Sequence, residues 1–169
     1  MKTKRLVFTA ILTAFALITF YIESAIPPVT PIYGIKLGIA NVFTLFALYA
    51  LNPYCAAAVL FIRIVLGSIF AGLGVSFIYS LVGGIASFLL MILLKRFFKK
   101  DKIWVLSVLC AIVHNVAQIF TAILIMESWQ IIFYLPVLIV SGIIAGAFTG
   151  FCAQITFVRL EKHIGNFNP

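Results

Sequence analysis

The stretch VSFIYSLVGGIASFLLMILL, residues 75–94, is followed by KRFFKKDK, residues 95–102, and then by IWVLSVLCAIVHNVAQIFTAILIM, residues 103–126. Each apolar segment is long enough to cross a bilayer, because about 20 apolar residues span the hydrocarbon core. The segment between them is short and basic, which is typical of a cytoplasmic loop. The pattern predicts two transmembrane helices joined on the cytoplasmic side.

The same alternation of basic and apolar segments extends to both ends of the chain. A second basic cluster, Lys2-Lys4-Arg5, precedes the first apolar segment, and a third, Arg159-Lys162-His163, follows the last one. Only 9% of the 169 residues are charged and 64% are hydrophobic, which is well above the roughly 45–50% apolar content of globular chains. We therefore expect a multi-spanning all-α integral membrane protein.

Prolines, glycines and polar residues divide the chain into six predicted helices within a single membrane domain, residues 1–169. These helices cover approximately residues 6–26, 36–51, 54–70, 75–94, 103–126 and 131–158. Six spans place all three basic clusters, and therefore both termini, in the cytoplasm. Helices 36–51 and 54–70 are short, so a re-entrant pair is an alternative that preserves the same sidedness.

The composition also excludes several classes of function. The net charge of +8 lies mainly at helix ends, where it suits anionic lipid headgroups, so we expect a lipid bilayer and no nucleic acid as partner. The first apolar segment is longer than the roughly 7–15 residues of a cleaved signal peptide, so we interpret it as a retained helix. The three cysteines lack a metal-binding or redox spacing and are interpreted as small buried hydrophobes.

Catalysis finds no support in the local chemistry. The chain has no P-loop, and its four acidic residues are too few and too scattered to hold magnesium and a diphosphate. We find no convincing nucleophile–base pair, and we predict no catalytic residue, metal or cofactor.

Arg63 is the strongest candidate for a functional residue. It lies about ten residues into helix 54–70, which is roughly 15 Å along the axis and too deep to reach the membrane surface easily. A charged side chain at the bilayer centre costs at least about 2.5–3.5 kcal/mol. Arg63 therefore either reaches Glu23, bonds to backbone carbonyls, or awaits an anionic ligand.

Other polar residues fall at similar depth on neighbouring helices. His114 and Gln118 are four residues apart and share a face, and Asn115 lies one step round the helix. A histidine at this depth also fits an inter-helix hydrogen bond. Together these residues offer donors and positive charge, which favours an outward-facing site for a small anionic or amphipathic solute. The predicted substrate-binding residues are Lys36, Asn41, Arg63, His114, Asn115 and Gln118.

The ordered motifs resemble the Gx transporter family, whose members are often labelled heptaprenyl diphosphate synthase component I. The resemblance covers most of the chain and is carried by several stretches. These are Pro27-Pro28, Gly34 to Asn41, Thr44-Leu45, Arg63 to Gly67, Ser80 to Gly84, His114-Asn115, Gln118, Leu135-Pro136, Gly142, Gly146 and Thr149-Gly150.

That family is similar to the S-components, the substrate-binding membrane subunits of energy-coupling factor vitamin transporters. The resemblance implies six helices, a coupling subunit docked on an Ala-x-x-x-Ala motif, here Ala10 and Ala14, and separate ATPases. It also implies a substrate-capping gate in the loop that holds Pro27, Pro28, Pro31 and Gly34. In the residues alone, the two alanines fit either internal packing or an external partner.

The leading hypothesis is a non-enzymatic, multi-pass subunit of the bacterial inner or plasma membrane. It would take up a molecule of the vitamin, quinone or isoprenoid-precursor class. One alternative is a solitary secondary transporter, with proton coupling at His114 or Glu23. The other is a non-catalytic membrane accessory of prenyl diphosphate or quinone synthesis.

Overall fold

A computed structural model describes residues 2–25, 36–71, 74–98 and 100–164. Over these residues the secondary structure is helical, without a strand. In chain order, the elements are α1 (Lys2–Ala25), α2 (Asn41–Ala50), α3 (Pro53–Ala71), α4 (Val75–Leu94), η1 (Lys100–Lys102), α5 (Ile103–Met126), η2 (Trp129–Tyr134) and α6 (Leu135–Ile164). The predicted all-α bundle with six α-helices, in the predicted order, is confirmed.

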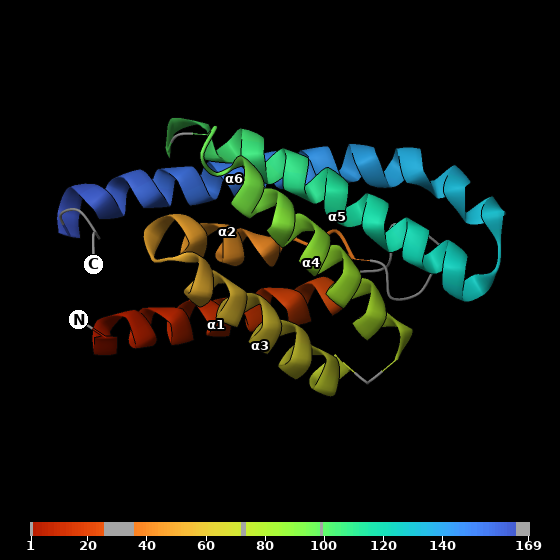
Figure 1. Ribbon diagram of the computed structural model, residues 1–169, viewed down its shortest axis with the longest axis horizontal. Coiled ribbons are helices and arrows are strands. Elements are labelled where there is room, and N and C mark those ends of the chain that lie inside the picture. Colours follow the sequence, from red (N-terminus) through yellow and green to blue (C-terminus); the bar gives the residue numbers. More distant parts are fainter. Residues whose placement is uncertain (1, 26–35, 72–73, 99, 165–169) are drawn as a thin grey trace.

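The helices form two groups that meet around α2 (Figure 1). In one group α1 packs on α3, and in the other α5 packs against both α4 and α6. The shortest helix, α2, contacts all five of the other α-helices. Its buried residues are Asn41, Thr44, Leu45, Ala47 and Leu48. The shortest helix is therefore the centre of the bundle.

Five helices, α1 and α3 to α6, are long and apolar enough to cross a membrane. The ten residues of α2 rise only about 15 Å, half the roughly 30 Å of the hydrocarbon core. The start of α1 and the end of α6 lie at the same end of the bundle as the linker between α4 and α5 (Figure 1). That end carries the three basic clusters, and the positive-inside rule assigns it to the cytoplasm.

The sequence-based prediction was wrong about where α2 begins. It placed the start at residue 36, whereas the structure has non-helical backbone over residues 36–40 and starts α2 at Asn41. Gly38 has a left-handed φ of +77°, which interrupts a helix. The chain then turns by a bond from the Asn41 N–H to the Gly38 carbonyl at 2.9 Å. The N–H groups of Lys36 and Gly38 donate to the side chains of Gln118 and Glu23 instead of to carbonyls of a helix.

The prediction was also wrong at the start of the last helix. Residues 129–134 form the 3-10 helix η2, and α6 begins only at Leu135. Pro136 has no N–H to donate to an earlier turn, so it suits the first turn of a helix and not its interior. The ends of α1 and α6 also extend beyond the apolar segments, to Lys2 and Ile164, because hydropathy marks the membrane and not the end of a helix. The predicted gate loop with Pro27, Pro28, Pro31 and Gly34 lies outside the described residues.

Glycines on α6 allow close contact with α5. A Cβ atom on Gly150 would lie 2.7 Å from the Cα of Trp104, and one on Gly146 would lie 2.9 Å from the Cα of Val108. These neighbours are backbone atoms, which cannot move aside as a flexible side chain can. Small residues at this spacing let two backbones approach closely, and such packing holds helices together in lipid.

Gly150→Ala is therefore expected to lower the free energy of unfolding in mixed micelles by about 1–3 kcal/mol, because an added methyl overpacks the contact with α5. The same substitution at Gly74 is the control, since a Cβ there meets nothing within 4 Å. Equal unfolding free energies for the two variants would contradict the assignment of the α5–α6 contact to glycine packing.

Candidate functional site

The polar site begins at Asn41, the first residue of α2. Its side chain is buried, and its Oδ1 accepts a hydrogen bond of 2.8 Å from Nη2 of Arg63 on α3. Its Nδ2 lies 3.1 Å from Nδ1 of His114 on α5. Arg63 and His114 lie near the middle of their helices, so this contact of three helices is at mid-membrane depth.

The bond from Arg63 determines the proton positions around His114. Arg63 only donates, so the oxygen of Asn41 must face it and the Asn41 amide nitrogen donates to His114 Nδ1. A neutral imidazole then carries its hydrogen on Nε2, which lies 3.0 Å from Nε2 of Gln118. The Gln118 oxygen already accepts from the Lys36 backbone N–H at 3.2 Å. Two donors therefore compete for one oxygen, and the site is rich in donors.

Glu23 on α1 holds the non-helical segment from the other side. Its Oε1 accepts a hydrogen bond of 2.7 Å from the N–H of Gly38. The carboxylate is 7% exposed, and its Oε2 has no hydrogen-bond partner. Glu23 was predicted as a possible partner of Arg63 and as a possible proton-coupling residue. The hydrogen bond of Arg63 goes to the amide of Asn41, while the opposite charges of Arg63 and Glu23 attract each other. The carboxylate thus joins the site through the backbone of residues 36–40.

Lys36 brings a second positive charge to the site, from outside the spanning helices. Its Nζ donates to Ser24 Oγ at 2.6 Å and lies 3.4 Å from the ring centroid of Phe20, a cation–π contact. Partial burial lowers the pKa of the ammonium to about 8, with Glu23 acting in the opposite direction and Arg63 in the same one.

Phe20 links the two cations. The guanidinium carbon of Arg63 lies 5.9 Å from the centroid of the same ring that Lys36 contacts. A Cβ on Gly67 of α3 would come within 2.7 Å of this ring, so the glycine lets Phe20 lie close to α3. Sequence reasoning missed Phe20; its position three residues before Glu23, on the same face of α1, is the signal that could have identified it.

Two glycines leave room for the imidazole. A Cβ on Gly83 of α4 would lie 2.9 Å from ring atoms of His114, and one on Gly38 would lie 2.7 Å from another. The ring is thus enclosed between α4 and the non-helical segment. Gly83 belongs to the motif Ser80–Gly84 noted in the sequence, but its role against His114 was not predicted.

The structure brings together five of the six predicted binding residues and separates the sixth. The five are Lys36, Asn41, Arg63, His114 and Gln118. Asn115 points toward α6, where its Nδ2 donates to the Leu138 carbonyl at 2.7 Å and packs against Gly142. The Asn115 side chain thus contacts α6 and not the other five side chains. Its role in substrate binding stays a prediction.

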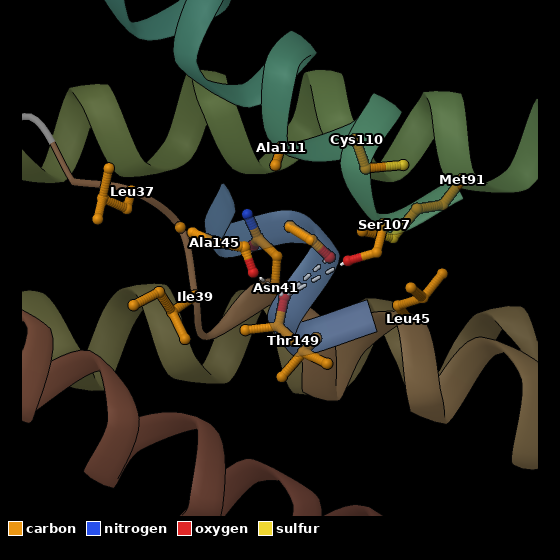
Figure 2. A pocket seen from close by; sticks show the side chains of 13 residues that line it. Leu37, Ile39, Asn41, Leu45, Met91, Ser107, Cys110, Ala111, Ala145 and Thr149 are labelled. Carbon is orange, nitrogen blue, oxygen red and sulfur yellow. Dashed lines mark hydrogen bonds between the residues drawn. The ribbon is translucent and has the colours of Figure 1, made fainter. Parts of the chain in front are cut away.

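A small cavity lies beside Asn41 and is lined by residues of α2, α4, α5, α6 and the segment before α2 (Figure 2). Its volume is about 10 Å³, about the room of one water molecule. Ser107 and Thr149 contribute hydroxyl groups to it, 3.5 Å apart. A drug-sized metabolite needs a pocket of about 300 Å³ or more, so this cavity is not the predicted substrate site. Among the described residues, no cluster of three or more metal-binding side chains is present.

Comparison with known proteins gave two matches. The sequence matches the family described as heptaprenyl diphosphate synthase component I over residues 12–156. The fold matches a solved structure described as "Structure and mechanism of the S component of a bacterial ECF transporter", with a TM-score of 0.61 and 23% identity. That match covers 99% of this chain and 98% of the other, so the two share a fold over their whole length. No protein of curated function matches the sequence.

The hydrogen bond between Arg63 and Asn41 predicts that the effect of substituting one residue on the unfolding free energy depends strongly on the other residue. Asn41→Leu should cost about 3 kcal/mol of unfolding free energy, because it leaves the guanidinium buried without its acceptor. Adding Arg63→Met should recover part of this loss, since the uncompensated charge is then removed. A double-mutant cycle in mixed micelles should give a coupling of roughly 1–3 kcal/mol. Costs that add to within about 0.5 kcal/mol would contradict the pairing.

Proposed function

The chain belongs to the family described as heptaprenyl diphosphate synthase component I, and from its site and fold we propose that it is a membrane subunit that binds a small molecule for uptake. The substrate is anionic or amphipathic, of the vitamin, quinone or isoprenoid-precursor class. A separate coupling subunit and ATPases supply the energy, since the chain has no P-loop.

One observation carries this proposal. Arg63 is 2% exposed at mid-membrane depth, and its hydrogen bond goes to a neutral amide. Its Nε has no hydrogen-bond partner. A buried charge in this position costs several kcal/mol unless it is paired, which favours a role in binding over a role in packing. His114 and the Lys36 backbone compete for the oxygen of Gln118, which leaves one donor without an acceptor, and the ammonium of Lys36 adds further donors. An acceptor-rich solute therefore suits the cluster.

The word synthase in the family description does not suit these residues. Diphosphate chemistry through magnesium needs several carboxylates around one metal, and this chain has four acidic residues in total. Glu23 lies in the bundle and Asp101 lies in η1 at the cytoplasmic end. We therefore propose a non-enzymatic role.

The first experiment is native mass spectrometry of the gently purified protein, to detect a co-purified small molecule. A defined non-lipid mass that is lost in Arg63→Ala would support substrate binding. Lys95→Ala is the matched control, because this cation also contacts α2, at the Leu48 carbonyl 2.6 Å away, but at the cytoplasmic end. Loss of the molecule in both variants, or a stoichiometric soluble enzyme in its place, would contradict the proposal and favour the accessory role.

The surface of α1 supports a docking role for Ala10 and Ala14. Both are exposed, whereas Leu12 and Ala16 on the opposite side are buried in the bundle. Small residues four positions apart leave a shallow groove into which another transmembrane helix can fit. Internal packing, the alternative explanation of this motif, does not use these two side chains.

Ala10→Leu combined with Ala14→Leu is expected to abolish co-purification of a transmembrane coupling subunit by filling that groove. The unfolding free energy should change by less than about 0.5 kcal/mol, because exposed positions contribute little to folding. Ala25→Leu, exposed at the other end of α1, is the control. Undiminished recovery of the coupling subunit with the double variant would place docking elsewhere.

A further inference from the structure

Two buried atoms of opposite polarity in the site have no hydrogen-bond partner. One is Oε2 of Glu23, an acceptor on a side chain that is 7% exposed, and the other is Nε of Arg63, a donor on one that is 2% exposed. Buried polar atoms in native proteins nearly always have partners, so each exception needs a reason. The opposite charges of Glu23 and Arg63 attract each other, but a charged group with an atom that lacks a hydrogen-bond partner is costly at membrane depth and is a candidate for function.

These two atoms belong to one connected cluster. Glu23 Oε1 binds the Gly38 N–H at 2.7 Å, and the Gly38 carbonyl accepts from the Asn41 N–H at 2.9 Å. The Asn41 side chain then accepts from Arg63 Nη2 at 2.8 Å. The unpartnered acceptor and the unpartnered donor are therefore at the two ends of a single hydrogen-bonded chain.

Phe20 places the charged groups around one ring. It lies one turn before Glu23 on α1, and its ring contacts the Lys36 ammonium at 3.4 Å and the Arg63 guanidinium at 5.9 Å. The carboxylate faces the backbone N–H groups of Gly38 and Ile39, and the guanidinium donates to Asn41. Oε2 of Glu23 and Nε of Arg63 remain without a hydrogen-bond partner. The cluster thus offers both a positive and a negative binding point.

A purely anionic solute would use only half of this arrangement. Its acidic group would pair with Arg63 and Lys36, but it would leave Glu23 Oε2 without a donor and bring two negative charges together in a medium of low dielectric constant. A solute that also carries an N–H donor or an ammonium group would satisfy both free atoms. Complementary pairing of this kind is the ordinary condition for burying charge.

We infer that the substrate is amphoteric: it carries an acidic group for Arg63 and Lys36, and next to it a basic N–H donor of the ammonium or amidine type for Glu23. This inference rests on the proposed uptake function and narrows its substrate class from anionic to amphoteric. Glu23 is then a specificity-determining residue that also positions Gly38.

Glu23→Gln tests this role directly. The amide oxygen of glutamine can still accept from the Gly38 N–H, while its NH₂ group replaces the free acceptor with a donor. The variant also imitates a protonated Glu23, which would place a donor at the same position. Glu127→Gln is the matched control, because that carboxylate is exposed at the end of α5.

The probe is a small-molecule extract, below about 1 kDa, of the cells from which the protein is purified. It is passed over the immobilised full-length protein in detergent, and retained compounds are identified by mass spectrometry. The expected compound carries both an acidic group and an N–H donor, and Glu23→Gln should weaken its binding roughly 10- to 100-fold, as expected for one hydrogen bond to a charged group. Glu127→Gln should bind as the wild-type protein does.

A second measurement does not depend on the folding of the variant. The analogue of the retained compound in which the N–H donor is removed should bind the wild-type protein more weakly by a similar factor. A retained compound without such a donor, equal binding by Glu23→Gln, or equal binding of the analogue would each overturn the inference and leave the proposed function intact. Retention of no compound by the wild-type protein would overturn both.

Discussion

The structure depends on how non-helical backbone is accommodated inside a membrane bundle. Residues 36–40 enter the bundle without helical hydrogen bonds, and lipid offers no partner for their N–H groups. The Glu23 carboxylate accepts a hydrogen bond from the Gly38 N–H, and the Gln118 oxygen accepts one from the Lys36 N–H. Glu23 is 15 positions from Gly38 and Gln118 is 82 positions from Lys36, so this segment depends on its contacts with α1 and α5.

The same constraint explains the central position of α2. Because the chain reaches mid-membrane depth before it becomes helical, α2 needs only ten residues to reach the cytoplasmic side. Its first residue, Asn41, meets Arg63 and His114, and near its other end the Leu48 carbonyl accepts from Lys95 at 2.6 Å. The short helix thereby connects the polar site with the cytoplasmic loop.

The polar site is assembled under a second constraint, an imbalance of donors and acceptors. Arg63 orients Asn41, Asn41 orients His114, and His114 competes with Lys36 for the oxygen of Gln118. A purely structural network at this depth would be expected to satisfy all its members. Here one donor is left over, so the network is not fully satisfied by the protein alone.

The sequence by itself determined the membrane class, the order of the helices and the exact limits of α4 and α5, because hydropathy and basic flanks depend on local composition. It also singled out Arg63, Asn41 and His114 as candidates, since polar residues at membrane depth are costly. Only the tertiary structure decided that α2 begins at Asn41, that Asn115 points to α6 and that Glu23 binds Gly38. Those outcomes follow from contacts between residues up to 82 positions apart, and a local pattern does not contain them.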